Sequence, residues 1–314
     1  MNRFLILLFC LLGGIWCDHR LSPGENMNLK SYCGTKPYLP LPTVPTKPSA
    51  EEHQSLKASC GTKSNLSRRF ESRSIAGGKP IQGNEAPWAA KIHYPKISCS
   101  STIISLRHIM SASHCLMSNI TKLYDRFDRM RSECSGNDLI IYPESSELTA
   151  RNSNGKLLSD KVSKIIMMNF CLHPNARYDD MMIWELSENI PFDDYAYPAC
   201  ISSGLGYQKH ERPRNQDAEK WMFPGKMISE VTELEGLQIS DSKSRRYNKL
   251  WLIVDGKRWG VQARPGDSGG SLMHYVNGQF YVIGVISHGW DTFMLGTPSV
   301  HAHYTRICQH TGIC

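Results

Sequence analysis

The chain has 314 residues, of which 40% are hydrophobic and 21% charged, and 36 basic against 29 acidic residues give a net charge of +7. This composition excludes a disordered or collagen-like chain, and the length is sufficient for one large domain or two small ones. The positive excess is spread along the sequence, which is typical of a solvated basic surface and does not indicate a nucleic-acid partner.

The first 17 residues are typical of a secretory signal peptide. A basic start at Arg3 precedes an apolar run from Phe4 to Trp16, and the chain turns polar after Cys17. The run is shorter than the roughly 20 residues of a membrane-spanning helix. We therefore expect cleavage after Cys17, an extracellular location and no membrane partner. Removing Cys10 and Cys17 from the eleven cysteines would leave nine in an exported chain, where disulfides form and persist. Because nine is odd, one thiol would be free or would pair with another chain.

Residues 18–74 are expected to form an irregular prosegment or linker. Five prolines between Pro37 and Pro48 favour an extended, polyproline-like chain with few apolar neighbours. Asn65 and Asn119 each begin an Asn-x-Ser/Thr sequon, which fits glycosylation of a secreted protein.

Residues 75–314 predict an all-β domain. Short alternating or β-branched runs are separated by clusters of Gly, Pro, Asn and Asp, and no convincing amphipathic helix lies among them. The clearest runs are residues 101–106, 139–142, 162–168 and 281–287. Many short strands of this kind indicate a sandwich or a barrel.

Three short motifs carry candidate catalytic residues. The Gly-Asp-Ser-Gly-Gly turn at residues 266–270 would expose Ser268 and let backbone N–H groups converge on an oxyanion. His114 stands beside a cysteine, and Cys99 and Cys115 could close a loop that holds it. Asp180 enters an apolar run, where a buried carboxylate needs a partner such as a histidine ring.

Each motif alone has an ordinary structural explanation: a glycine-rich turn, a solvent-exposed histidine or a strand-capping aspartate. The order His114, Asp180, Ser268 makes the joint interpretation, a catalytic triad, much stronger than any part.

These residues resemble the trypsin/chymotrypsin-like serine peptidases over residues 75–314. Ser-Ala-Ser-His-Cys ends at Cys115, Asp-Met-Met-Ile-Trp-Glu-Leu begins at Asp180, and Gly-Asp-Ser-Gly-Gly is unchanged. Ile-Ala-Gly-Gly at residues 75–78 is similar to the family's mature start, and His-Tyr-Thr-Arg at residues 303–306 to its late Val-Tyr-Thr-Arg. The prosegment and the end of the chain resemble a divergent nematode branch. The resemblance implies an all-β fold of two six-stranded β-barrels.

The resemblance also implies the roles of the site residues. His114 would take the proton of Ser268, Asp180 would orient His114, and the N–H groups of Gly266 and Ser268 would bind the oxyanion. After activation Asp267 would pair with the new α-amino group. The implied activity is that of a secreted endopeptidase, without metal or cofactor. Its expected partners are protein or peptide substrates, an activating protease and protein inhibitors.

The substrate pocket departs from the family pattern. Gln262 stands where trypsin-type enzymes carry an Asp, so a cationic substrate side chain would enter without a countercharge. Ala302 replaces the usual pocket glycine, and His288 replaces a Trp on the substrate-binding strand, which runs from Ser287, the supporting serine of Asp180, to Gly289. We predict a preference for uncharged, medium to large side chains.

Activation departs as well, because the basic residue Arg73 is separated from Ile75 by Ser74. A cut after Arg73 would leave a terminus one residue too long to reach Asp267 as Ile75 would, and one residue spans up to about 3.5 Å. We expect cleavage between Arg73 and Ile75. Only ten residues follow Tyr304, so no long C-terminal helix is expected.

The disulfide expectations have three sources. The spacing of Cys99 and Cys115 around His114 predicts their pairing, and by resemblance Cys200 tethers the prosegment through Cys33 or Cys60. By elimination, the remaining pairs are Cys134–Cys171 and Cys308–Cys314.

Two other functions compete with the peptidase. A catalytically silent homologue could act as an extracellular binding protein on the same fold. An esterase would use the same triad chemistry, but the strand–elbow–helix context of the α/β-hydrolases is missing, so it ranks below both.

Overall fold

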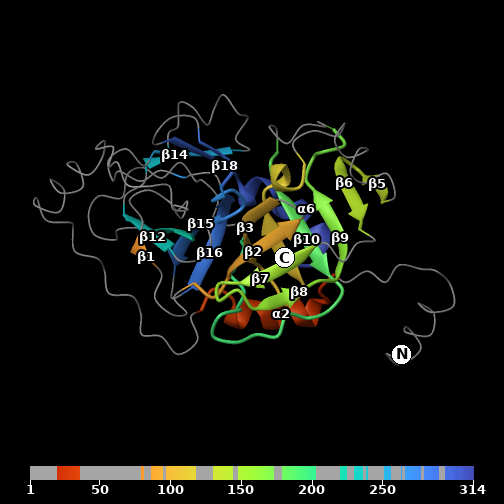
Figure 1. Ribbon diagram of the computed structural model, residues 1–314, viewed down its shortest axis with the longest axis horizontal. Coiled ribbons are helices and arrows are strands. Elements are labelled where there is room, and N and C mark those ends of the chain that lie inside the picture. The colour runs from red at the N-terminus through yellow and green to blue at the C-terminus, as the bar shows by residue number, and fades with distance from the viewer. Residues whose placement is uncertain are drawn as a thin grey trace, which may run out of the picture.

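Figure 1 shows the computed structural model of the chain. The structure describes residues 20–35, 79–80, 86–94, 97–117, 130–143, 148–172, 179–202, 220–224, 230–235, 238–239, 251–255, 263, 266–276, 279–289 and 294–314. Several sequence predictions fall outside these residues: the signal peptide, the sequons at Asn65 and Asn119, Cys60, Ser74, Ile75 and Gln262.

The strands of the first half of the chain form one antiparallel sheet of nine strands, in the order β5-β6-β9-β10-β4-β3-β2-β7-β8. Their bounds are β2 (Ala89–Tyr94), β3 (Ile97–Ile103), β4 (His108–Ser111), β5 (Arg131–Ser135), β6 (Asp138–Tyr142), β7 (Thr149–Asn152), β8 (Leu157–Ser159), β9 (Val162–Met167) and β10 (Met182–Leu186). The sheet has nine strands where the resemblance implied six, and the hairpins β5–β6 and β7–β8 provide two strands at each of its edges.

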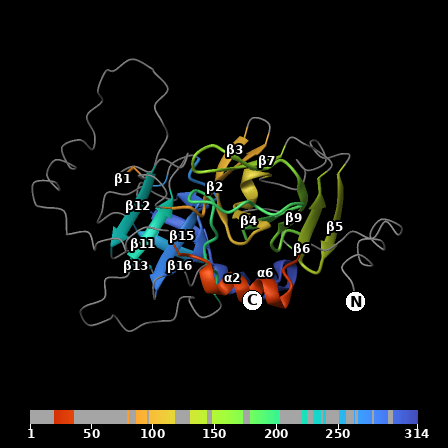
Figure 2. The same cartoon turned by 90° about the horizontal axis from the view of Figure 1, so that it is seen from below.

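The second half forms a five-stranded sheet, β1-β12-β11-β15-β16, and a four-stranded sheet, β13-β14-β18-β17. Their bounds are β1 (Lys79–Pro80), β11 (Lys220–Pro224), β12 (Glu230–Glu235), β13 (Gln238–Ile239), β14 (Trp251–Asp255), β15 (Ser271–Val276), β16 (Gln279–Val285), β17 (His288–Gly289) and β18 (Met294–Pro298). The two halves lie side by side in Figures 1 and 2. The expected all-β, chymotrypsin-like fold is confirmed.

The core lies where the first sheet is most apolar. All five residues of β10, from Met182 to Leu186, are buried, which is expected of a strand flanked on both sides by β9 and β4. The second half joins this core through β16, where the ring of Phe280 packs against Trp88 with ring centres 4.7 Å apart. The two halves therefore share apolar contacts next to the strands that lead to the site.

We expected residues 18–74 to be irregular, but part of this segment forms a helix. Helix α2 spans Pro23–Tyr32 and begins with a capping box, in which the Ser22 hydroxyl accepts from the Glu25 N–H and the Glu25 carboxylate accepts from the Ser22 N–H. The helix buries Leu29 against the domain core. The signal was the Ser-Pro-Gly-Glu start, since proline is favoured in the first helical turn.

We expected no long C-terminal helix, but a helix of 12 residues forms there. Helix α6 spans Val300–Thr311; Ser299 caps its start, and Gly312, with φ of 74°, ends it in the left-handed conformation. Its buried residues share one face: Val300, His303, Ile307 and Thr311. Figure 2 shows α2 beside α6, and the Leu21 N–H donates to the Thr311 carbonyl at 2.7 Å. Helices α2 and α6 are the two longest in the described residues. Neither is long and apolar enough to cross a membrane.

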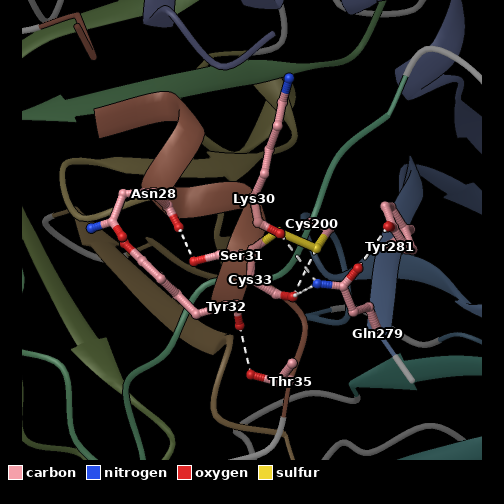
Figure 3. Close-up of a disulfide and its surroundings, with 9 residues drawn as sticks. All are labelled: Asn28, Lys30, Ser31, Tyr32, Cys33, Thr35, Cys200, Gln279 and Tyr281. Atoms are coloured by element: carbon pink, nitrogen blue, oxygen red, sulfur yellow. Dashed lines mark hydrogen bonds between the residues drawn. A yellow bond between two sulfur atoms is a disulfide. The ribbon is translucent and has the colours of Figure 1, made fainter. Parts of the chain in front are cut away.

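Four disulfides link the described cysteines. Cys99–Cys115 and Cys134–Cys171 form as predicted, as does Cys308–Cys314. Cys200 pairs with Cys33, one of its two expected partners. In Figure 3, the Gln279 side chain lies beside this bond and donates to the Cys33 carbonyl at 3.1 Å and the Lys30 carbonyl at 3.3 Å. The C-terminal carbonyls of α2 are thus bound to β16 next to the disulfide.

Candidate active site

His114 and Asp180 are brought together by two neighbouring strands. His114 lies in the short 3₁₀ helix η1 (Ser113–Cys115) just after β4, and Asp180 lies just before β10. Because these strands pair antiparallel, with Met182 opposite Ser111, the end of one meets the start of the other. The Cys99–Cys115 bond fixes η1 to β3.

Asp180 binds His114 through both carboxylate oxygens. Oδ1 accepts the backbone N–H of His114 at 2.7 Å, and Oδ2 lies 2.5 Å from Nδ1 of its ring. The Asp180 side chain is fully buried, whereas 28% of the His114 side chain is exposed. This geometry orients the ring and leaves Nε2 as the nitrogen able to exchange a proton.

The electrostatics of the pair favour its charged form. Burial disfavours a charged His114 ring, but the Asp180 charge and its hydrogen bond more than offset this, so the pKa of His114 is raised. Burial likewise opposes the Asp180 carboxylate, yet His114 and the hydroxyl of Ser287 hold its pKa below the ordinary value. Ser287 donates directly to Oδ2 of Asp180, the contact that the resemblance implied.

The Ser268 turn is bound to the end of β16. The Gly269 N–H donates to the Ile286 carbonyl at 2.8 Å, and the Ile286 N–H donates to the Gly270 carbonyl at 2.7 Å. Since Ser287 follows directly, the same chain segment holds the serine turn and contacts Asp180.

The turn also contacts the first half closely. The Ser100 hydroxyl donates to the Gly266 carbonyl at 3.0 Å. Gly269 has φ of 86°, and a Cβ there would lie 2.2 Å from the Ser100 carbonyl oxygen and 2.1 Å from Oγ of Ser111. The small residues Ser111 and Ala112 before His114 therefore admit the glycine, which places the turn against the segment leading to the histidine.

Ser268 itself is partly exposed. No backbone carbonyl within the described residues accepts from the N–H groups of Gly266 and Ser268. Catalytic hydrogen bonds are often long in free enzymes and tighten when substrate binds. Two backbone N–H groups on either side of Asp267, next to the hydroxyl, fit the expected oxyanion site.

The expected pocket residues separate into two groups. The Ser287 N–H donates to the Gly296 carbonyl at 3.2 Å, and in the β17–β18 pairing His288 lies opposite Gly296 and Gly289 opposite Leu295. Ala302 lies elsewhere, in the first turn of α6, where its N–H donates to the Ser299 hydroxyl at 3.4 Å. Ala302 therefore lies in helix α6 and not on β18, the strand that pairs with residues 288–289.

Asp267, the expected partner of a new N-terminus, is fully buried beside Ser268. Its carbonyl accepts the Gly270 N–H at 3.0 Å. Within the described part of the chain, no group of three His, Cys, Asp or Glu side chains is arranged to hold a metal ion.

The sequence motifs missed the residues around Asp179. This carboxylate is buried directly before Asp180, and it contacts Asn169 and His303. The signal was the Asp-Asp pair at the entrance to an apolar strand, because two adjacent carboxylates there each need a partner.

Several known proteins are similar to this chain. CLIP domain-containing serine protease B15 of Anopheles gambiae is 26% identical over 263 residues, covering 74% of this chain and 66% of the relative. Venom serine protease Bi-VSP of Bombus ignitus is 25% identical over 264 residues, covering 75% and 66%. Phenoloxidase-activating factor 3 of Holotrichia diomphalia is 24% identical, covering 75% and 70%. The chain thus spans just under two thirds of the length of the first two relatives.

Among solved structures, the scabies mite inactivated protease paralogue S-I1 matches with a TM-score of 0.50 at 15% identity, covering 74% of this chain and 97% of the paralogue. This likeness concerns the fold alone. The sequence profile of a single family matches residues 41–314, which includes all the motifs described above. The chain belongs to the nematode trypsin-6-like family.

Proposed function

We propose that this protein is a secreted serine endopeptidase that hydrolyses peptide bonds through an acyl-enzyme. The observation that carries the proposal is the pair of contacts from the buried Asp180 carboxylate to the backbone N–H and to Nδ1 of His114. A surface histidine needs no such support, whereas a general base must be held in one tautomer and orientation.

The proposed mechanism is the one that the family resemblance carries over. Nε2 of His114 takes the hydroxyl proton of Ser268 as Oγ attacks the substrate carbonyl carbon. The N–H groups of Gly266 and Ser268 stabilise the resulting oxyanion, and each such donor contributes about 3–4 kcal/mol. His114 then gives the proton to the leaving amine, which leaves an acyl group on Ser268. Water, deprotonated by His114, releases the acid and restores the serine.

We propose that residues 1–17 are a signal peptide, 18–74 a prosegment and 75–314 the peptidase domain. The match of the family profile to residues 41–314 supports the last of these only in part, because it begins within the prosegment. Secretion is supported by the four disulfides. Glycosylation of Asn65 and Asn119 is part of the same proposal.

Cleavage specificity is proposed from Gln262. An uncharged amide at the pocket base favours uncharged, medium to large side chains, because a buried Arg or Lys without a carboxylate costs several kcal/mol. A peptide library cleaved mainly after Arg would contradict this.

Activation is proposed to follow a cut between Arg73 and Ile75, with Asp267 receiving the new ammonium group. The complete burial of Asp267 next to Ser268 supports this role, because an ion pair is strongest where water is excluded. The proposed partners are an activating protease, protein substrates and protein inhibitors. Two relatives carry names of proteolytic or activating proteins, which favours protein substrates.

The experiment that tests the activity is covalent labelling. A fluorophosphonate should label the purified protein after activation, and peptide mapping should place the adduct on Ser268. The Ser268→Ala variant should remain unlabelled, and so should a heat-denatured control. A folded, activated protein without label would contradict the proposed peptidase.

A catalytically silent binding protein is the second candidate. The observation that favours it is the altered sequence at the expected pocket and activation positions, Gln262 and Ser74, and the similar mite protein is an inactivated protease paralogue. If trimmed proteins beginning at Ser74 and at Ile75 both fold, and neither is labelled or cleaves any peptide, the binding protein becomes the better interpretation.

A further inference from the structure

A buried polar network joins helix α6 to the residue before Asp180. Oδ2 of Asp179 accepts a hydrogen bond from the Asn169 side-chain amide. Oδ1 of the same carboxylate lies 3.2 Å from Nε2 of His303, whose side chain is fully buried. Neither of these two atoms makes an aligned hydrogen bond within the described residues, so their 3.2 Å approach is an electrostatic contact between two buried polar atoms.

Arg306 fixes the protonation of this histidine. One turn along α6, its Nη2 lies 3.0 Å from Nδ1 of His303, and a guanidinium can only donate hydrogen bonds. Nδ1 must therefore be the unprotonated acceptor, which places the ring hydrogen on Nε2, facing Asp179. His303 is thus a neutral imidazole whose Nε2–H group lies in contact with a buried carboxylate.

The same guanidinium binds the other side of the network. Nη1 of Arg306 donates to the Asn169 side-chain oxygen and lies 3.2 Å from Oδ1 of Asp138. The Asn169 N–H donates to the same Asp138 oxygen at 2.7 Å, and His310 contacts Oδ2 at 2.8 Å. Burial would raise the pKa of Asp138, but His310, Asn169 and Arg306 hold it low, so this anchor stays charged.

The backbone around Asn169 is held in an uncommon conformation by these contacts. Asn169 has φ of 54°, the left-handed region that few residues other than glycine adopt. The preceding Met168 N–H donates to the Met181 carbonyl at 3.0 Å. The network therefore holds the chain on both sides of Asp180: Asp179 through its side chain and Met181 through its carbonyl.

We propose that Asp179 and His303 are positioning residues for Asp180, held in place by Asn169 and Arg306. This inference rests on the proposed function, because it assigns them to the same triad. One peptide bond separates Asp179 from Asp180, and the Nδ1 contact of His114 requires the Asp180 carboxylate at one position. A misplacement of about 1 Å can lower turnover by about 100-fold.

The test measures the His114–Asp180 pair directly, in the full chain carrying Ser268→Ala, so that it does not depend on activity. Proton NMR follows the low-field Nδ1 hydrogen of His114 and its titration. His303→Leu exchanges one neutral side chain for another, so a shift reports geometry and not a changed charge. We expect the pKa of His114 to fall by about 0.5 unit or more and the resonance to broaden, because Asp180 is less fixed. His303→Gln keeps an amide donor and should restore most of the shift.

His108→Leu is the matched control. His108 is equally buried, contacts Glu185 at 3.4 Å and Ser105 at 2.7 Å, and lies at the other end of β4. It should lower the melting temperature without moving the His114 titration. Arg306→Lys, which keeps the charge but not the planar donor pair, gives a second measurement if His303→Leu does not fold. An unchanged His114 titration in the His303 or Arg306 variants, or an equal shift in His108→Leu, would overturn the proposal.

In the activated protein with its serine intact, His303→Leu should lower kcat by about 10-fold or more with KM unchanged. If the parent protein takes no fluorophosphonate, the proposed peptidase activity fails, while the NMR titration still decides whether His303 positions Asp180. The two hypotheses can therefore fail separately.

Discussion

The Ser100 hydroxyl on β3 donates to the carbonyl of Gly266 at 3.0 Å, so one hydrogen bond joins the first-half sheet directly to the turn that carries Ser268. His114 and Asp180 come from the first half, and Ser268 and Ser287 from the second. The proposed site can therefore form only if the two halves meet closely at this turn.

Gly269→Ala should disrupt the close contact between the Ser268 turn and the first-half sheet. The added Cβ would lie 2.2 Å from the Ser100 carbonyl, a backbone atom that cannot rotate away, and φ of 86° is unfavourable for alanine. We expect kcat/KM to fall by about 100-fold or more and unfolding to require about 2–4 kcal/mol less.

Gly155→Ala is the matched control for this prediction. Gly155 has a similar φ of 78°, but a Cβ there would meet nothing within 4 Å. It should cost only the backbone strain of about 1–2 kcal/mol and leave kcat/KM unchanged. Equal losses of activity in the two variants, measured with a peptide substrate and by urea unfolding, would show that close packing at Gly269 is unimportant.

The pH dependence of activity should reflect the raised pKa of His114. The ring must be neutral to take the proton of Ser268, so kcat/KM should rise with pH through the pKa of His114, at a value above the ordinary 6.5. Ser287→Ala removes a hydrogen bond to the buried Asp180 and should weaken the contact between Asp180 and His114. Steady-state kinetics between about pH 5 and 9 would check this, and an acid limb at or below 6.5 would contradict it.

The contact of His114 with Asp180 and the turn at Ser268 could be predicted from sequence because each residue stands in a short local pattern. The glycines around Ser268, the cysteine after His114 and the apolar run after Asp180 all specify their surroundings within a few residues. The contact of Asp179 with His303 could not be predicted in this way, because it depends on where a helix far along the chain is placed.

The two helices show a different limit. Ser22 and Glu25 form a capping box that the sequence displays openly, but the many prolines that follow favoured an irregular chain. For α6, the short stretch of ten residues after Tyr304 outweighed the local signals, Ser299 at the start and Gly312 at the end. Local capping chemistry was the better guide in both helices.

The tether between Cys33 and Cys200 should keep the N-terminal segment attached after activation. The two cysteines are 167 residues apart, so their bond restricts the unfolded chain strongly, and removing it should cost about 2–4 kcal/mol. After cleavage near Ser74, the parent protein should run as one band on a non-reducing gel and as two on a reducing gel. Cys33→Ser with Cys200→Ser should give two bands on both gels.

Cys308→Ser with Cys314→Ser is the control for the tether. Its bond joins residues only 6 apart, so the entropic part of the loss is smaller, and the N-terminal segment should stay attached. If the Cys33 and Cys200 variant still runs as one band after cleavage, another covalent link holds the segment, and the assigned tether is wrong.

The Glu25–Arg107 ion pair should make the docking of α2 dependent on pH. The Glu25 carboxylate lies 3.2 Å from Nη1 of Arg107. Burial alone would raise the pKa of Glu25, but hydrogen bonds from the Ser22 N–H and from Arg107 lower it from 4.5 to about 2. Its contribution to stability is therefore complete above pH 4.5 and is lost as the pH falls toward 2.

Glu25→Gln should then lower the free energy of unfolding by about 1 kcal/mol at pH 7, a modest value because the carboxylate is partly exposed and screened by solvent. The difference from the parent protein should shrink steadily below pH 4.5, where the unfolded chain becomes protonated first. Glu188→Gln, which breaks the exposed pair with Lys161, is the control and should produce no measurable change. Urea unfolding at pH 7, 5 and 3 would measure both variants. A loss for Glu25→Gln that stays constant from pH 7 to pH 3 would mean that the carboxylate stabilises α2 by packing and not by its charge.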